Sequence, residues 1–478
     1  MPLILPGNVA SATADAGYTV ANSCRFDKGD TAYMHKTTSA GNRKTWTYST
    51  WFKRISLGTQ VTFGLVQANT ANDNIMAVQL VAANTMDIWD YNGGMSAQIT
   101  TNRVFRDVGS WYHVVLAVDT TDSTANNRMR LYINGVEERG AGGYSTDTMP
   151  AEDYTFNINV ADKALKLGVY DYGSVSSPAD FYLAETVFID GTQYAASDFG
   201  EFDEDSPTIW KPKDVSGLTF GTNGFYLDYE ASDNLGNDAN GGTDLTEVNL
   251  AATDQSTDTP TNNFCTWNPL VNIGTATTYS EGNLTVSSDD AEYRVSPSTL
   301  AVGSGKWYVE FKAVSGHDAT TDVAVGIVQA DTNFSTASQN LSAYPNGYSY
   351  GSGGRVSNYD NSTIYTGSTY TDGDILGVVV DLDNSKLYFH KNGTYQNSGD
   401  PTSGATGTGA VSITAGKDYY IACSTITSGG TKVFSANFGS PAYANSSSVA
   451  DGNGYGAFEY AVPSGYYALC TKNLAEYG

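Results

Sequence analysis

Basic side chains are scarce in this sequence, which has 25 lysines and arginines but 51 aspartates and glutamates in 478 residues. The formal net charge of −26 repels phosphate backbones and anionic membrane surfaces, so nucleic acid is not an expected partner. Cysteine is scarce too. Its four positions form no CxxC spacing, which favours unpaired, partly buried thiols over a disulfide framework (Cys24, Cys265, Cys423 and Cys470).

Long apolar runs and a secretion signal are also missing. No run of about 18 apolar residues occurs, so we predict no membrane insertion. The first residues, MPLILPGNVA, hold only three consecutive apolar side chains, and no lysine or arginine precedes them, unlike a signal peptide. We therefore expect no export by the signal-peptide route, and residues 1–16 are the candidate anchor to a larger assembly.

A stretch of seven residues occurs twice. GLVQANT, Gly64–Thr70, returns as GIVQADT, Gly326–Thr332, with five identical residues. In each half an aromatic run comes before this stretch. An apolar run that ends in aspartate comes after it, and then an alternating run that meets Asn-Gly, at Asn134-Gly135 and at Asn392-Gly393. Asn-Gly tolerates the two positive φ angles of a type I′ turn, so each half is predicted to contain the same strands and a tight hairpin.

Short alternating runs, separated by polar and glycine-rich turns, extend over the whole chain, and no long window shows a helical apolar stripe. This pattern predicts an all-β fold of sandwich type, in more than one domain because the chain exceeds a single core. Only Tyr194–Phe202 favours a helical turn or two. Residues 231–263 lack lysine, arginine and aromatic residues, so we predict a linker there, part of which packs down, between domains at 17–230 and 264–478.

Both halves resemble known families. SWYHVVLAVDTTDSTANNRMRLYINGVEE, Ser110–Glu138, is similar to the core of laminin-G-like domains. The second half resembles a SPRY domain through GKWYVEFK, VGIVQA, GYSYGSGGR, DGDILGVVVDLDNSKLYFHKNG and FSANFG. Both families belong to the concanavalin A-like jelly-roll class. The resemblance implies two concanavalin A-like jelly-roll β-sandwiches in tandem, the first laminin-G-like and the second SPRY-like.

Three further segments are similar to phage tail and virion proteins (Leu183–Phe202, Gly221–Glu230 and Asn249–Leu270). This resemblance implies a virion structural protein of a tailed bacteriophage, which assembles in the host cytoplasm with other virion proteins. We expect a tail-fibre or appendage subunit, a homotrimer by analogy, that recognises a host-surface glycan or receptor protein. Two alternatives stay open: a head-fibre or capsid decoration protein, and a depolymerase that cuts surface polysaccharide.

Catalytic signatures are weak. β-Glucanases of this fold class present E-x-D-x-E or E-x-D-x-x-E on a strand, because two carboxylates must flank the glycosidic bond. The nearest match, EFDED at Glu201–Asp205, has aspartate where the last glutamate is needed. The four histidines are scattered and no G-x-S-x-G occurs, although one sequence leaves a Ser-His-Asp triad open. We therefore expect no enzymatic activity.

No cofactor is expected. DANGGTDLTEVN, Asp238–Asn249, imitates a calcium-binding EF-hand loop but departs from that pattern at Gly242, Thr243 and Asn249. A structural calcium ion held by aspartates in another arrangement stays open.

Aromatic residues in polar stretches are the candidate ligand-binding residues. A flat ring matches the apolar face of a sugar, and nearby amides, carboxylates or a guanidinium match its hydroxyl groups. We expect exposed clusters in DIWDYNGG and in AYPNGYSYGSGGRVSNYDNSTIY, and the predicted residues are Trp89, Asp90, Tyr91, Asn92, Tyr344, Tyr348, Tyr350, Arg355 and Tyr359. The alternative is that alternate tyrosines pack the sandwich or a subunit interface.

Overall fold

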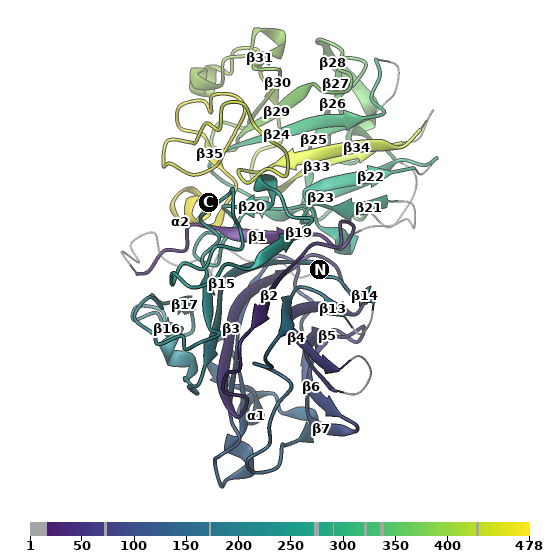
Figure 1. The fold of residues 1–478 in the computed structure, drawn as a ribbon. Helices are drawn as coiled ribbons and strands as arrows, with labels where there is room; N and C mark the ends of the chain where they lie inside the picture. The colour runs from purple at the N-terminus through teal and green to yellow at the C-terminus, as the bar shows by residue number, and fades with distance from the viewer. Residues whose placement is uncertain are drawn as a thin grey trace. The chain divides into compact units, whose positions relative to one another are not determined.

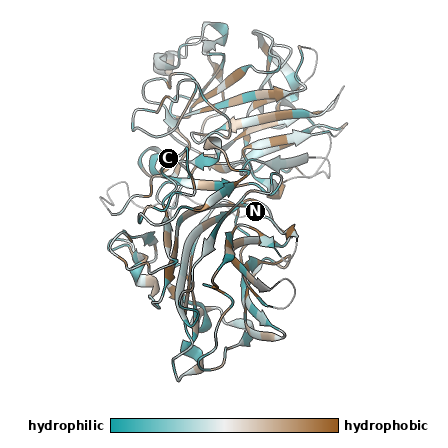
Figure 2. Cartoon of the chain, in the orientation of Figure 1, coloured by the Kyte–Doolittle hydropathy of each residue, from teal (hydrophilic) through white to brown (hydrophobic). Residues whose placement is uncertain are grey.

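The computed structural model describes residues 17–70, 74–171, 174–271, 277–289, 291–319, 323–334, 339–426 and 430–478. The candidate anchor, residues 1–16, lies outside the described residues. The described chain forms two compact units that divide after Thr261, and each is built almost entirely of β-strands (Figure 1). Hydrophobic and hydrophilic residues alternate along many of these strands, as a period-two pattern predicts (Figure 2).

Two sheets enclose the core of the first unit. One has the order β10-β9-β8-β3-β15-β1-β20 with β18 paired to β15, and the other β11-β7-β6-β5-β4-β12-β2-β19. The strands of the first sheet are β1 (Ser23–Phe26), β3 (Thr45–Arg54), β8 (Trp111–Asp119), β9 (Met129–Ile133), β10 (Val136–Glu137), β15 (Phe181–Asp190), β18 (Phe225–Leu227) and β20 (Gln255–Ser256). Those of the second are β2 (Tyr33–Thr38), β4 (Val61–Thr70), β5 (Asn74–Leu80), β6 (Thr85–Asn92), β7 (Met95–Val104), β11 (Tyr144–Thr148), β12 (Lys163–Leu167) and β19 (Thr246–Val248). Side chains from both sheets meet in one apolar cluster that includes Trp46, Phe52 and Phe63.

The other elements of the first unit are two small hairpins and several short helices. They are β13 (Tyr170–Asp171), β14 (Val175–Ser176), β16 (Gly200–Phe202), β17 (Trp210–Pro212), α1 (Glu138–Ala141), η2 (Ala125–Asn127), η3 (Ala196–Asp198) and η4 (Ala252–Asp254). The 3₁₀ helix η3 lies inside Tyr194–Phe202, which confirms the predicted helical turn.

The second unit is also a pair of sheets around one core. One has the order β21-β22-β34-β24-β29-β30-β31, with β32 paired to β30 and β35 to β24, and the other β23-β33-β25-β26-β27-β28. The first sheet contains β21 (Thr277–Ser280), β22 (Thr285–Ser288), β24 (Lys306–Ser315), β29 (Ile375–Asp381), β30 (Lys386–Lys391), β31 (Thr394–Tyr395), β32 (Val411–Ser412), β34 (Lys432–Asn437) and β35 (Tyr467–Ala468). The second contains β23 (Arg294–Val302), β25 (Ala324–Gln329), β26 (Tyr348–Gly351), β27 (Arg355–Asn358), β28 (Ser362–Thr366) and β33 (Tyr419–Thr425). The helices are η5 (Pro269–Val271), η6 (Leu341–Ala343), η7 (Tyr359–Asn361), η8 (Gln396–Ser398), η9 (Pro401–Thr406) and α2 (Thr471–Tyr477).

The two units share one strand order in both of their sheets. The run β9-β8-β3-β15-β1 of the first unit corresponds to β30-β29-β24-β34-β22 of the second. The run β7-β6-β5-β4-β12-β2 corresponds to β28-β27-β26-β25-β33-β23. The register agrees as well, because Trp46 lies opposite Val118 in the first unit and Trp307 lies opposite Val380 in the second. The same sandwich is therefore built twice.

The repeated heptapeptide lies on corresponding strands, β4 and β25, and its side chains face the same way in both. Leu65 and Ile327 point into the cores between the sheets. Val66 and Val328 belong to smaller apolar clusters on the outer face of their sheets. The two copies are therefore similar because they occupy the same strand position, where alternate side chains must be apolar on both the inner and the outer face of the sheet.

The glycine of the heptapeptide is needed for strand packing. Replacing Gly326 by alanine is expected to destabilise the second unit by about 1–3 kcal/mol, the usual cost of overpacking. The added Cβ would overlap the backbone carbonyl oxygen of Tyr348 on β26, which cannot rotate away. Denaturant unfolding of the full chain measures the loss. The control is Gly351→Ala, whose Cβ would meet its nearest atom at 3.6 Å, and equal losses in the two variants would contradict this account.

Two other local predictions, the Asn-Gly turns and the cysteines without disulfides, are confirmed. Asn134 and Gly135 have φ angles of 47° and 77°, and Asn392 and Gly393 have 48° and 76°, as a type I′ turn requires. None of the four cysteines forms a disulfide, and all are buried. Among the described residues, no helix is both long and apolar enough to cross a bilayer.

The predicted linker adds strands to the first unit. Within residues 231–263, β19 pairs with β2 and β20 pairs with β1. The segment is also fixed by side chains, because the Lys53 ammonium donates to the Asp258 carboxylate at 2.7 Å and Ser23 Oγ donates to the Asp258 carbonyl oxygen at 2.7 Å. Residues up to Thr261 therefore pack as part of the first unit.

Candidate functional site

An aromatic cluster lies on the outer face of the second sheet of the first unit. Asp87, Trp89 and Tyr91 alternate with buried residues along β6, so these three side chains share the outward face. Tyr170 of β13 lies against Trp89, with ring centroids 6.1 Å apart. The rings are half-buried because they pack on the apolar cluster around Val66. We call the surface formed by Asp87, Trp89, Tyr91, Gln98 and Tyr170 the β6 face.

Polar groups border these rings. The Asp87 carboxylate accepts hydrogen bonds from Gln98 Nε2 at 3.0 Å and from Thr100 Oγ1 at 2.7 Å, both at Oδ1. The Trp89 indole N–H donates to Gln79 Oε1 at 3.4 Å. The face therefore offers flat apolar rings beside acceptor groups held in fixed positions, which is the combination that a sugar requires.

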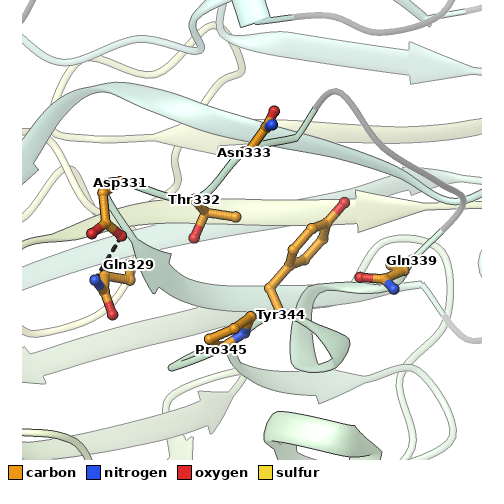
Figure 3. A pocket seen from close by; sticks show the side chains of 7 residues that line it. All are labelled: Gln329, Asp331, Thr332, Asn333, Gln339, Tyr344 and Pro345. Carbon is orange, nitrogen blue, oxygen red and sulfur yellow. Dashed lines mark hydrogen bonds between the residues drawn. The ribbon is translucent and has the colours of Figure 1, made fainter.

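A cleft opens in the second unit at β25, which corresponds to β4 of the first unit. Its cavity has a volume of about 400 Å³ and lies between the end of β25, the loop that follows and the residues after η6 (Figure 3). Its lining residues are Gln329, Asp331, Thr332, Asn333, Gln339, Tyr344 and Pro345. The Tyr344 ring is supported by an edge-to-face contact with Phe334, with ring centroids 5.6 Å apart. We call this cavity the β25 cleft.

The two candidate surfaces lie on the outer face of corresponding sheets, although on different strands. The β6 face packs on Val66, and Tyr344 of the β25 cleft belongs to the apolar cluster that contains Val328. Both valines come from the repeated heptapeptide. Trp89 and Tyr91 of the first sequence cluster and Tyr344 of the second are therefore placed on the outer face of corresponding sheets.

Two family models match the chain. Residues 27–166 match the concanavalin A-like lectin/glucanases superfamily, in its laminin-G-like form, and residues 306–429 match the SPRY domain. A laminin-G-like domain is followed by a SPRY domain. Together with the shared strand order, this confirms two concanavalin A-like sandwiches in tandem.

The similar solved structures are distant in sequence. Mouse laminin alpha1 domains LG4-5 are 12% identical, with 87% of this chain and 85% of that chain covered and a TM-score of 0.28. The SPRY domain of human HERC1 is 14% identical, with 36% and 96% covered and a TM-score of 0.27. A pentraxin of Limulus polyphemus is 14% identical, with 37% and 80% covered and a TM-score of 0.28. No curated protein matches the chain, and the comparisons give no indication of a phage origin, so the virion role stays a prediction.

The structure corrects one of the predicted site residues of the laminin-G-like domain. Asp90 is buried, because its side chain points to the opposite side of β6 from Trp89. Its carboxylate accepts hydrogen bonds from Tyr154 Oη at 2.6 Å and from the backbone N–H of Asn157 at 2.7 Å. Burial raises the pKa of Asp90 to about 6. Asp90 therefore holds a neighbouring loop in place, whereas contact of Trp89, Tyr91 and Asn92 with a ligand stays a prediction.

In the SPRY domain, the expected exposure is wrong for three tyrosines. Tyr348 and Tyr350 lie at alternate positions of β26 and point into the core, as the alternative of sandwich packing predicts. Tyr350 contacts the rings of Tyr370 and Phe389. Tyr344 is largely buried as well, although it lines the β25 cleft. Arg355 and Tyr359 lie nearer the surface but do not line the cleft, and ligand contact by either residue stays a prediction.

Ser49 and His113 form a hydrogen-bonded pair, but the hydrogen bond runs in the opposite direction to that of a catalytic serine–histidine pair. The Trp210 indole can only donate, and its N–H lies 2.9 Å from His113 Nδ1, so Nδ1 is the acceptor. The proton is then on Nε2, which donates to Ser49 Oγ at 2.9 Å and cannot accept the serine proton. Burial lowers the pKa of His113 to about 3, which keeps the ring neutral.

The acidic run EFDED does not form the catalytic carboxylate pair of a glycosidase. In EFDED the Asp203 carboxylate accepts the backbone N–H groups of Asp205 and Ser206, which is the pattern of a turn. Across the part of the chain that the structure describes, no group of three or more His, Cys, Asp or Glu side chains could hold a metal ion. Calcium also takes backbone carbonyl and side-chain amide oxygens as ligands, so this finding leaves the calcium alternative open, and the expectation of no enzymatic activity stays a prediction.

Proposed function

We propose that the protein is an adhesion protein that binds glycans, with the β6 face as its main contact surface. The observation that carries this proposal is the gathering of Trp89, Tyr91 and Tyr170 on one outward face, next to the fixed carboxylate of Asp87. Rings of this kind supply apolar area to the C–H face of a sugar, and acceptors of this kind receive its hydroxyl protons. The β25 cleft is the second contact surface, and its volume lies in the range of small-ligand sites.

We further propose that the protein acts as a tail-fibre or appendage subunit of a tailed bacteriophage. Support comes from the similarity of Leu183–Phe202 and Gly221–Glu230 to phage virion proteins. Assembly as a homotrimer would place several weak sugar sites on one particle. Linked sites bind more tightly than single sites by orders of magnitude, provided that they can engage together.

The Trp89→Ala variant tests the binding proposal. Loss of a central aromatic side chain is expected to weaken binding to surface glycans at least about tenfold, as at other aromatic-centred interfaces. The measurement is the affinity of the purified full chain for an array of microbial surface glycans. Phe202→Ala is the matched control, because Phe202 is 42% exposed in the same domain but lies on the β16–β17 hairpin. Equal binding by wild type and Trp89→Ala would count against the β6 face.

Two further measurements separate the proposed role from its alternatives. Electron microscopy of particles that carry the protein should place its density on the tail or an appendage. Density on the capsid shell would favour a head-fibre or decoration protein. Release of reducing ends from the bound polysaccharide would favour a depolymerase.

A further inference from the structure

The β6 face contains little positive charge. Among the described residues, the lysines and arginines of β4, β5, β6, β7 and β12 are Arg103, Lys163 and Lys166. Arg103 forms an ion pair with Glu138 at 2.9 Å. Lys163 lies on the same side of β12 as the core residues Leu165 and Leu167, so Lys166 is the one that shares the outer face. Its ammonium forms an ion pair with the Asp171 carboxylate and lies 5.8 Å from the centre of the Tyr33 ring. His35 lies opposite Lys166 in the ladder, and burial together with the Lys166 charge lowers the pKa of His35. The basic groups near this face are therefore neutralised or neutral.

The acidic groups at the face are arranged differently. Asp87 is held beside Trp89 by side chains that donate to one carboxylate oxygen, Oδ1, whereas no hydrogen bond to Oδ2 is found among the described residues. A sugar hydroxyl can donate to that oxygen. A carboxylate, sulfate or phosphate group of a ligand would instead meet a like charge, on a chain whose formal net charge is −26.

We infer that the β6 face selects uncharged glycans, such as chains of neutral hexoses or N-acetylhexosamines, and rejects glycans that carry acidic groups. This inference rests on the proposed glycan-binding function and names the ligand class of that site. Residues Asp87 to Tyr91 span about 13 Å along the strand, so the face contacts more than one sugar ring. The β25 cleft differs in charge, because the Arg294 guanidinium lies close enough to Tyr344 to act on the pKa of that hydroxyl.

A glycan array that contains matched neutral and acidic polysaccharides tests the inference. Mannan, laminarin and chitohexaose serve as neutral probes, and alginate, heparin and polysialic acid as acidic probes. We expect the purified full chain to bind neutral glycans at least tenfold more tightly, with little change between 0.15 M and 1 M salt. Preferred binding to acidic glycans would overturn the inference but leave the adhesion proposal standing. Binding to none of the glycans on the array would overturn the adhesion proposal itself.

Reversing the charge at the face connects the selectivity to Asp87. The variant Asp87→Lys is expected to raise the ratio of acidic to neutral glycan binding at least tenfold, because the new ammonium faces the ligand. Asp205→Lys is the control, since it makes the same change in net charge at an exposed loop of the same domain. Equal shifts in the two variants would show that net charge alone sets the preference, and an unchanged ratio in Asp87→Lys would remove the β6 face from the site. Unfolding curves of both variants show whether each retains the wild-type fold.

Discussion

Replacing Asp258 by alanine is expected to lower the free energy of unfolding of the laminin-G-like domain by about 3–5 kcal/mol, the cost of breaking a buried ion pair from one side. The Lys53 and Asp258 side chains are 1% and 2% exposed, and the Trp111 indole donates to the second carboxylate oxygen at 3.1 Å. In the variant, the Lys53 ammonium stays buried near the Tyr182 ring without this counter-ion. Denaturant unfolding of the full chain, followed by tryptophan fluorescence, measures the loss, since five of the seven tryptophans lie in this domain (Trp46, Trp51, Trp89, Trp111 and Trp210).

The control for this prediction is an exposed ion pair in the same domain. Lys44 donates to Asp153 at 3.0 Å, but the two side chains are 40% and 65% exposed, so Lys44→Met should cost at most about 1 kcal/mol. The double variant Lys53→Met with Asp258→Leu should recover most of the lost stability, because no charge is then left buried. If Asp258→Ala costs no more than Lys44→Met, the buried pair does not hold the 253–261 segment to the domain.

The pairing of Lys53 with Asp258 also shows where sequence reasoning ends. Residues 231–263 have the composition of a loop, and the sequence predicts a linker on that basis. Their attachment to the first sandwich depends on backbone pairing in β19 and β20 and on an ion pair between residues 205 positions apart. Amino-acid composition predicts neither the strand pairing nor the ion pair. In contrast, the presence of the same strands and of a tight hairpin in both halves could be predicted from the repeat, because alternation and Asn-Gly turns are local properties of the chain.

The candidate site was predictable in part. The sequence TMDIWDYN already alternates, and a strict period-two reading places Asp87 with Trp89 and Tyr91, and Asp90 on the opposite side. That reading would have found Asp87 and excluded Asp90. Tyr170 could not be found in this way, because the folded sheet brings it to Trp89 from a separate strand. Tyr348 and Tyr350 were misplaced because tyrosine is equally suited to a core and to a wet surface, so residue type alone does not decide its burial.

A second large effect is expected from the buried carboxyl group of Glu185. This residue is 5% exposed and has a φ of 49°, at a bulge of β15 where its pairing with β3 shifts register. Its Oε2 accepts hydrogen bonds from Tyr18 Oη at 3.1 Å and Tyr226 Oη at 2.9 Å. Burial raises the pKa of Glu185 to about 8, and the charges of Asp228 and Glu230 act in the same direction. The folded domain therefore keeps a proton that the unfolded chain has lost.

The sign of the resulting pH dependence follows from proton binding. Below about pH 4.5 the carboxyl is neutral in both states and has no effect on stability. Between pH 4.5 and 8 the folded state binds more protons than the unfolded state, so stability falls as the pH rises, by about 1.4 kcal/mol per pH unit. Above pH 8 both states are ionised and the loss levels off, at roughly 5 kcal/mol. The variant Glu185→Gln cannot ionise and should lose this dependence.

The measurement is the difference in the free energy of unfolding between Glu185→Gln and the wild type, at a series of pH values from 4.5 to 9. The difference should rise from near zero to several kcal/mol in favour of the glutamine variant. Subtraction cancels the titration of other buried groups, such as Asp90 and His113, which both proteins share. A flat line for Glu185→Gln would mean that the carboxyl is ionised in the fold, and that the two tyrosine hydroxyls stabilise its charge well enough to offset burial.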